Sequence, residues 1–314
     1  MLDRGLGMKK ILVTGAGGFI AHHLASRLKE MGHFVRGADV KLPEYCATKA
    51  DEFLLVDLRQ KENCAKAVKD MDEVYPLAAD MGGIGYISQS HAEITVNNTL
   101  MDVNMIAQAQ AAGVKRLLYS SSACVYPQFL QHEADVTPLK EEDAFPAQPE
   151  EGYGLEKLYT EKLCQYFTED FGMETRVVRF HNVYGPLGTY DGGREKAPAA
   201  ISRKIAAAHE GDAIEIWGDG KQTRSFMYID DCVEGIIRIM RSDHREPLNL
   251  GTDELVTIDE LVDIVAKAAG KRIEKRHDVP FCKNRNNGRN RRAQAGIACI
   301  CRFRCRRQAK GMRP

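Results

Sequence analysis

The chain lacks long apolar runs and a cysteine framework, and no secretory leader is expected. Although 44% of its 314 residues are hydrophobic, no run reaches the roughly 18 apolar residues that a membrane-spanning helix needs. The first apolar run, at residues 11–13, is too short to be the core of a secretory signal. The five cysteines before residue 279 follow neither disulfide-scaffold nor zinc-ligand spacing, which suits a reducing compartment. We therefore expect a cytoplasmic globular protein of enzyme size, with no membrane partner and no metal.

Acidic residues and leucine are absent from residues 279–314. All 44 acidic residues lie in 1–278, whereas 279–314 holds 11 of the 44 basic residues, so the formal net charge of zero hides two different parts. The basic part has no helical or strand period, and we expect an atypical, disordered tail. A nucleic-acid-binding tail is the alternative, because basic runs attract phosphates. Only Phe281 and Phe303 are aromatic in this part, and they form no repeated pattern with the charge, so an altered C-terminus without a nucleic-acid partner is preferred. Residues 1–7 are expected to be a loose extension.

Strand and helix patterns alternate over residues 8–180. Short apolar runs that end in polar residues occur at 10–14, 32–39, 53–57, 74–80 and 115–119, and a helix pattern covers 97–111. This alternation predicts an α/β fold with a Rossmann-type doubly wound parallel sheet. Further helix patterns at 229–241 and 257–269 predict a smaller C-terminal substrate-binding domain over 181–278, partly interleaved with the first.

Three glycines follow the first predicted strand. Gly15, Gly17 and Gly18 let the backbone turn tightly and approach a pyrophosphate, whose charge would meet free amides at the next helix N-terminus. Asp39 ends the second strand, a position where a carboxylate can accept hydrogen bonds from the adenosine ribose hydroxyls. The same carboxylate would repel the 2′-phosphate of NADP. Asp57 could contact the adenine of the cofactor, or it could be a solvent-exposed acidic residue in a loop. The pattern predicts NAD, and the predicted cofactor-binding residues are Gly15, Gly17, Gly18, Phe19, Ile20, Asp39, Asp57, Tyr153 and Lys157.

The run 117–127 brings three serines to the carboxyl end of a predicted buried strand. Tyr153 and Lys157 follow four residues apart, and so lie on one face of a helix. A lysine charge lowers the pKa of a nearby phenol, so Tyr153 could take a proton from a substrate hydroxyl near neutral pH while Ser122 bonds the same oxygen. The spacing alone also fits an exposed helix face, and Cys124 alone also fits a buried, inert thiol.

These motifs resemble those of the extended short-chain dehydrogenase/reductases that act on nucleotide sugars. The Thr-Gly-x-x-Gly turn, the Ser-Ser-Ser-x-x-Val-Tyr run and Tyr-x-x-x-Lys occur in that family's order, although the last turn glycine is Ala21 here. The resemblance implies that Tyr153 removes the proton of a hexose 4-hydroxyl while hydride passes to NAD, with Ser122 and Lys157 in support. The ketone formed at carbon 4 would then acidify the hydrogens on carbons 3 and 5.

Three further segments, at residues 78–85, 179–200 and 217–226, resemble those of the GDP-mannose 3,5-epimerase family. Sugar-nucleotide 4,6-dehydratases carry an Asp-Glu pair after the serine, whereas this chain has Ala123 and Cys124. The likeness implies that Cys124 and Lys196 are the acid/base pair that inverts carbons 5 and 3, so that GDP-D-mannose becomes GDP-L-galactose. The implied substrate-binding residues are Gly82, Ser122, Asn182, Glu195, Lys196, Lys204, Gln222 and Arg224.

Two other functions stay open. Another nucleotide-sugar enzyme, such as a UDP-hexose 4-epimerase, would share the proton relay, and the altered tail also fits a non-catalytic NAD-binding protein. In the family that the chain resembles, the tail region holds an arginine that binds the diphosphate, and Arg285 and Arg289 are loosely similar candidates. The resemblance further implies a homodimer that forms through two helices of each subunit.

Overall fold

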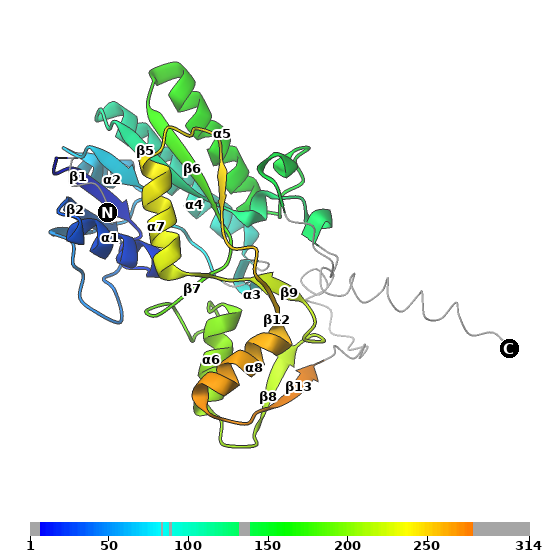
Figure 1. Cartoon of the computed structure of the whole chain (residues 1–314). Helices are drawn as coiled ribbons and strands as arrows, with labels where there is room; N and C mark the ends of the chain where they lie inside the picture. The colour runs from blue at the N-terminus through cyan, green and yellow to red at the C-terminus, as the bar shows by residue number, and fades with distance from the viewer. Residues whose placement is uncertain (1–6, 83, 88–89, 132–138, 279–314) are drawn as a thin grey trace.

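The central sheet is parallel throughout. The computed structural model describes residues 7–82, 84–87, 90–131 and 139–278. Within them, seven strands pair in the order β11-β6-β5-β4-β1-β2-β3 (Figure 1). They are β1 (Lys10–Thr14), β2 (Phe34–Asp39), β3 (Glu52–Leu55), β4 (Glu73–Tyr75), β5 (Arg116–Ser122), β6 (Glu174–Phe180) and β11 (Leu248–Leu250). The order 3-2-1-4-5-6 is doubly wound, which confirms the predicted Rossmann-type fold.

Helices cover both faces of this sheet. One face carries α1 (Phe19–Glu30) and α7 (Ile229–Arg241), and the other carries α2 (Lys61–Val68), α4 (His91–Ala111) and α5 (Tyr153–Phe171). Leu24 and Ile236 are fully buried on the first face, and Met105 and Cys164 on the second. Because both faces are covered, the strands can be apolar on both sides, as β1 and β5 are. No helix of the described ranges is both long and apolar enough to cross a membrane.

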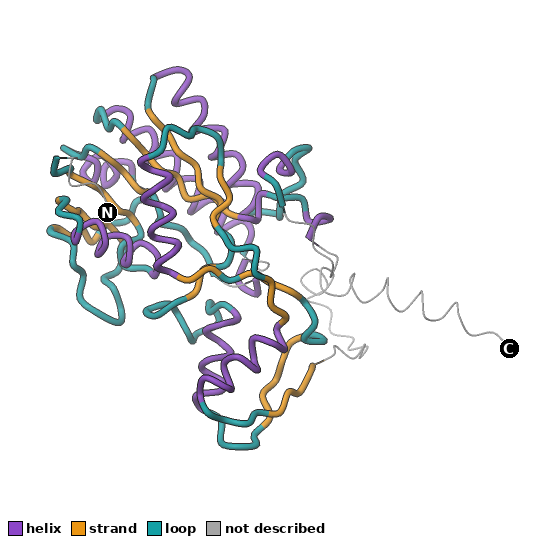
Figure 2. Tube along the Cα trace, in the orientation of Figure 1, coloured by secondary structure: helices purple, strands orange, loops and turns teal. Residues whose placement is uncertain are grey.

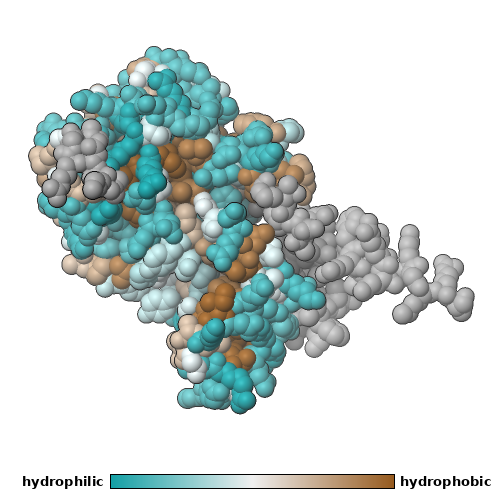
Figure 3. Space-filling model, in the orientation of Figure 1, coloured by the Kyte–Doolittle hydropathy of each residue, from teal (hydrophilic) through white to brown (hydrophobic). Residues whose placement is uncertain are grey.

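A smaller layer lies beyond the carboxyl end of β6 (Figure 2). Its elements are α6 (Ala197–Ala207), α8 (Ile258–Ala269), and the parallel pair β8 (Ala213–Trp217) and β13 (Glu274–Asp278). Ile205, Ile214 and Val262 form its own small core. Two short ladders join it to the sheet, namely β7 (Val183–Tyr184) with β10 (Met227–Tyr228) and β9 (Thr223–Ser225) with β12 (Leu255–Thr257). Apolar surface remains visible between the sheet and this layer (Figure 3).

Three elements test the expected boundaries. α8 begins after the capping box of Thr257 and ends at Gly270, as predicted. β4 stops at Tyr75, so only the start of the 74–80 run forms a strand, as expected from Pro76, which has no amide to donate to a ladder. α4 begins six residues before Asn97, since the neighbouring Asn98 does not cap the helix but is buried and accepts a hydrogen bond from the amide of Asp80 at 2.7 Å.

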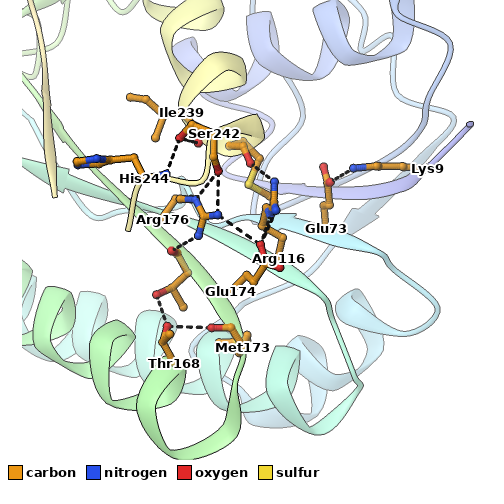
Figure 4. Close-up of polar contacts among 12 residues, drawn as sticks. Lys9, Glu73, Arg116, Thr168, Met173, Glu174, Arg176, Ile239, Ser242 and His244 are labelled. Carbon is orange, nitrogen blue, oxygen red and sulfur yellow. Dashed lines mark hydrogen bonds and ion pairs between the residues drawn. The ribbon is translucent and has the colours of Figure 1, made fainter. Parts of the chain in front are cut away.

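Two arginines of the central sheet form hydrogen bonds with the C-terminal end of α7 (Figure 4). Arg176 on β6 is 2% exposed and donates from Nε and Nη2 to the carbonyl of Ser242, at 2.9 and 2.8 Å. Arg116 on β5 donates to the carbonyl of Met240 at 2.8 Å, and both guanidinium groups contact the carboxylate of Glu174. The two cations therefore meet the carbonyl end of α7, where the helix dipole is negative.

We expect Arg176→Met to lower the free energy of unfolding by about 2 to 3 kcal/mol, because buried carbonyls lose a charged donor. The matched control is Arg238→Met on α7, whose side chain is 75% exposed and pairs only with Glu234 four residues earlier. That control should cost no more than about 0.5 kcal/mol. Urea denaturation measures both, and equal losses in the two variants would contradict the anchoring role of Arg176.

Candidate active site

The turn between β1 and α1 requires glycine at two positions. Gly15 has a φ of +69°, and a Cβ there would lie 2.8 Å from the oxygen of Leu77 and from the nitrogen of Ala78. A Cβ on Gly17 would lie 2.2 Å from the oxygen of Lys41. Side-chain carbons do not approach backbone atoms this closely, so the turn keeps an open backbone surface.

That surface offers backbone donors and one carboxylate. Gly18 is the N-cap of α1 and brings no capping side chain, so the first-turn amides of Phe19 and Ile20 can serve an anion. The amide of Gly17 donates to Asp39 Oδ2 at 2.9 Å. Burial raises the pKa of the Asp39 carboxyl, and its amide hydrogen bonds oppose that shift. These residues fit the pyrophosphate and the ribose of a dinucleotide.

Asp57 lies just beyond β3 and is paired within the chain. Its carboxylate accepts from Arg59 Nη2 at 2.7 Å, and this hydrogen bond lowers the pKa of Asp57 below its ordinary value. The cleft beside the glycine turn is lined instead by Gly17, Gly18, Phe19, His22, Lys41 and Thr189.

We expect Gly17→Ala to weaken NAD binding at least about tenfold, because the new methyl group must displace the Lys41 backbone at the turn. Gly188→Ala is the control, since a Cβ there would meet only ordinary contacts at 3.6 Å. Isothermal titration of NAD into both variants measures the difference. Unchanged affinity in Gly17→Ala would show that this turn does not hold the dinucleotide.

β5 and α5 bring the predicted proton relay together. Ser122 ends β5 and is buried, Tyr153 begins α5, and Lys157 lies one turn later. Lys157 Nζ is 5.6 Å from the centre of the Tyr153 ring. Cys124, in the short 3-10 helix η1 (Ala123–Val125), packs in the same cluster as Tyr153, and its amide donates to Ser122 Oγ at 3.2 Å. The Tyr153 hydroxyl faces Met81, with 3.6 Å between Oη and Sδ.

The pKa of Tyr153 corrects one expectation. Burial raises the pKa of the phenol well above its ordinary value, although the Lys157 charge lowers it. The sequence suggested a phenol tuned towards neutral pH, but Tyr153 is 4% exposed, and desolvation of the phenolate outweighs the cation. The lysine opposes the effect of burial rather than overcoming it.

Cys124 and Lys196 lie close enough to influence each other's charge. Burial raises the pKa of the Cys124 thiol to about 12 and the Glu150 charge adds to the rise, whereas a hydrogen bond with Ser122 and the Lys196 charge oppose it. Burial likewise lowers the pKa of Lys196, and a charge on Cys124 or on Cys232 opposes it. Burial therefore favours the neutral thiol and amine, while their mutual attraction favours the ion pair.

The loop that leads to Lys196 contacts Asp80 and Tyr86 through Arg194. The guanidinium of Arg194 lies 3.9 Å from the centre of the Tyr86 ring and 3.4 Å from the Asp80 carboxylate. A Cβ on Gly82 would come within 3.2 Å of the Arg194 side chain. Gly82 and the Lys196 loop, which are far apart in sequence, therefore face each other.

The other predicted substrate residues bond to the chain itself. Asn182 Nδ2 donates to a carbonyl of β9 at 3.2 Å, and Lys204 Nζ and Gln222 Nε2 donate to carbonyls of β8 at 2.7 and 2.9 Å. Glu195 lies 3.2 Å from an arginine of α6. Arg224 donates to the carbonyl of the residue before it at 2.7 Å. The two tail candidates, Arg285 and Arg289, lie outside the described residues.

Sequence reasoning missed two polar residues at this site, Thr223 and Asp102. Thr223 Oγ1, like Oε1 of the predicted Gln222, is buried and has no hydrogen-bond partner among the residues that the structure describes. Asp102 on α4 is buried and binds Lys157 Nζ at 3.1 Å. Its signal was present in the sequence, because Asp102 falls four residues after Asn98 and so on the same buried face.

Comparisons with known proteins agree with this geometry. The model of the NAD dependent epimerase/dehydratase family matches residues 11–251. The chain is 53% identical over 270 residues to GDP-mannose 3,5-epimerase of Arabidopsis thaliana, which covers 85% of this chain and 71% of that protein. It is also 53% identical over 258 residues to GDP-mannose 3,5-epimerase 1 of Oryza sativa subsp. indica, with coverages of 82% and 68%.

A solved structure gives the same picture of the fold. UDP-glucuronic acid 4-epimerase from Bacillus cereus, in complex with UDP-glucuronic acid and NAD, superposes with a TM-score of 0.71 at 26% identity. The match covers 85% of each chain. The family model over residues 11–251 includes the glycine turn, the relay residues, and α6 and β8 of the smaller layer.

Proposed function

The chain belongs to the NAD dependent epimerase/dehydratase family, and on that premise we propose that it converts GDP-D-mannose to GDP-L-galactose by inverting carbons 3 and 5. The observation that carries the proposal is the mutual influence of Cys124 and Lys196, with Cys124 packed against Tyr153. A 4-epimerase needs only the Tyr153 relay, whereas inversion at two further carbons needs an additional acid and base.

The first step requires a proton acceptor beside the cofactor. Bound NAD would accept the hydride from carbon 4 and later return it. Tyr153 takes the proton of the 4-hydroxyl, and the Lys157 charge stabilises the phenolate. Ser122 Oγ already accepts the amide of Cys124, so its own proton is free for the substrate oxygen.

The second step exchanges protons next to the new ketone. Inversion requires one group that removes a proton and another that delivers one from the opposite face. A thiol and an amine meet this need, because each can give up or accept a proton, and their mutual attraction opposes the neutral state that burial favours. After the exchange, Tyr153 returns its proton to the oxygen on carbon 4.

The substrate would lie between the sheet and the smaller layer. We propose that residues 181–278 form the substrate-binding domain and that the sugar nucleotide contacts Gly82, Asn182, Glu195, Lys204, Gln222 and Arg224. The buried, unpartnered oxygens of Gln222 and Thr223 support this, since buried polar groups normally have partners.

A homodimer fits the outer face of α4 and α5. Val96 and Leu100 on α4 are 56% and 45% exposed, and Leu155, Tyr159 and Tyr166 on α5 are 58%, 53% and 52% exposed. Adjacent apolar side chains of this size mark association surfaces. Sedimentation velocity of the protein and of a Leu155→Glu variant tests whether α5 forms the contact.

A cytoplasmic location also belongs to the proposal. The described residues contain five free cysteines, of which Cys64, Cys164 and Cys232 are buried. Unpaired thiols suit a reducing compartment. Fractionation of cells that express the full chain would decide the location.

The decisive experiment is turnover of GDP-mannose in heavy water. If the proposal is right, NMR will show GDP-L-galactose with deuterium at carbons 3 and 5. A 4-epimerase would act on UDP-hexoses and leave carbons 3 and 5 unexchanged, and a non-catalytic NAD-binding protein would leave every sugar unchanged. Either outcome would overturn the proposal.

A further inference from the structure

A charged cluster lies beneath Tyr153 in an otherwise apolar layer. α4 and α5 lie side by side (Figure 1) and enclose Asp102, Glu156 and Lys157, which are 3%, 3% and 0% exposed. Asp102 Oδ2 accepts from Lys157 Nζ at 3.1 Å and from the Tyr119 hydroxyl at 2.9 Å. Glu156 Oε2 is 3.9 Å from the same ammonium and accepts no hydrogen bond from the described residues. One cation therefore faces two carboxyl groups.

Two buried carboxylates beside one ammonium would leave an uncompensated negative charge. Burial raises the pKa of Glu156 to about 8, the Lys157 charge opposes the rise, and the neighbouring Asp102 charge adds to it. Near neutral pH, Glu156 thus keeps its proton, which leaves one buried carboxylate opposite one ammonium. The cluster is then electrically neutral, which is the state that burial favours.

We propose that Asp102 and Glu156 form a proton-sharing carboxyl pair that positions Lys157 and sets how strongly its charge supports the Tyr153 phenolate. The inference rests on the proposed roles of Tyr153 and Lys157. Neither carboxyl group touches the reacting atoms, so both are positioning residues. Asp102 holds the Lys157 ammonium 5.6 Å from the Tyr153 ring centre. Because Glu156 is protonated, it adds no second negative charge to the cluster.

The pair also makes the site sensitive to pH. The charges of Asp102 and Glu156 both raise the pKa of Tyr153, whereas Lys157 lowers it. As the pH passes about 8, Glu156 ionises and adds a charge that disfavours the phenolate. The other titratable groups that face the cluster are Cys64 on α2, Tyr119 on β5, Cys124 on η1, and Tyr153 and Cys164 on α5. Burial raises the pKa of each of these above its ordinary value, so they stay neutral in this range.

Infrared spectroscopy tests the pair without turnover. At pH 7 the intact full-length protein should show the carbonyl stretch of a buried, protonated carboxylic acid, which should fade as the pH passes about 8. Glu156→Gln should lack this band. In Asp102→Asn the band should fade at a lower pH, because the charge that raises the pKa of Glu156 is gone. A band that is missing from the wild type at pH 7, or unchanged in Glu156→Gln, would overturn the proposal.

Kinetics tests the consequence for Tyr153. The rate of NADH formation with GDP-mannose should rise with pH as phenolate accumulates, and the rise should weaken above about pH 8 in the wild type. Glu156→Gln should match the wild type within about twofold at pH 7, where Glu156 is already neutral, and should keep rising above pH 8. Asp102→Asn should lose about tenfold in kcat with little change in KM, because the Lys157 ammonium loses the carboxylate acceptor that holds it in place beside Tyr153.

The two readouts separate the possible failures. An infrared titration as described, together with no GDP-mannose turnover by the wild type, would count against the proposed function and leave the carboxyl pair standing. Identical pH profiles in the wild type and in Glu156→Gln would overturn the link to Tyr153. Near-ultraviolet circular dichroism checks the fold of each variant, and the isosteric Glu156→Gln keeps the test open should Asp102→Asn not fold.

Discussion

Tyr153→Phe should abolish the transient NADH signal and lower turnover of GDP-mannose by about 10²- to 10⁴-fold, the range that a positioned general base contributes. The phenyl ring keeps its packing against Ile87 and Ile94 and its place 5.6 Å from Lys157 Nζ. The lost hydroxyl contacts only the Met81 sulfur among the described residues, at 3.6 Å, so little stability is lost.

Stopped-flow absorbance of NADH checks this result. Tyr159→Phe is the matched control, since Tyr159 lies on the same helix, is 53% exposed and should behave as the wild type. Because burial raises the pKa of Tyr153, the wild-type rate should still be rising with pH on the alkaline side of neutrality. NADH that forms at an unchanged rate in Tyr153→Phe would show that another group accepts the proton.

The cofactor side of the site could be predicted from local sequence. Gly15 and Gly17 are needed because backbone atoms of neighbouring elements occupy the space of a side chain, and such close approach leaves a glycine pattern in the sequence. Tyr153 and Lys157 lie four residues apart on α5, so their spacing in the sequence also predicts that their side chains lie close together. Local geometry of this kind is encoded within a few residues.

Contacts between distant segments could not be read in this way. Lys196 stands 72 residues after Cys124 and approaches it only through the loop that Arg194 holds over Tyr86. No spacing rule joins such positions, and only the family resemblance suggested the pair. The balance of burial against charge at Tyr153 likewise depends on the packed tertiary structure, which is why the direction of its pKa shift was expected wrongly.

The cluster beneath Tyr153 shows a third reason for failure. Asp102 lies within the helix that was expected at 97–111, but the sequence pattern did not show which face of that helix is buried. Glu156 stands inside the Tyr-x-x-x-Lys motif, where it was treated as a spacer. Sequence alone does not distinguish a buried acidic residue from a surface one, because burial depends on which helix packs against it. Lys157, which pairs with both carboxyl groups, had already been assigned to support Tyr153.

Cys124→Ala should separate the two chemical steps of the proposed reaction. NADH should still form, because Tyr153 and Ser122 keep their places: the bond to Ser122 Oγ comes from the Cys124 amide, and the Cys124 carbonyl still accepts the amide of Glu150 at 3.0 Å. Deuterium uptake at carbon 5 in heavy water should fall by about 10²- to 10⁴-fold, since one of the two proton-transfer groups is gone.

Cys232→Ala is the control that makes this prediction specific. Cys232 also influences the charge of Lys196, and burial raises its pKa to about 12 as it does that of Cys124. It lies on the fully buried face of α7, however, so its loss should reduce stability by about 1 kcal/mol and leave the exchange intact. Mass spectrometry of the recovered sugar nucleotide measures uptake in both variants. Uptake that persists at the wild-type rate in Cys124→Ala, or that falls equally in Cys232→Ala, would mean that proximity to Lys196 does not identify the acid/base thiol.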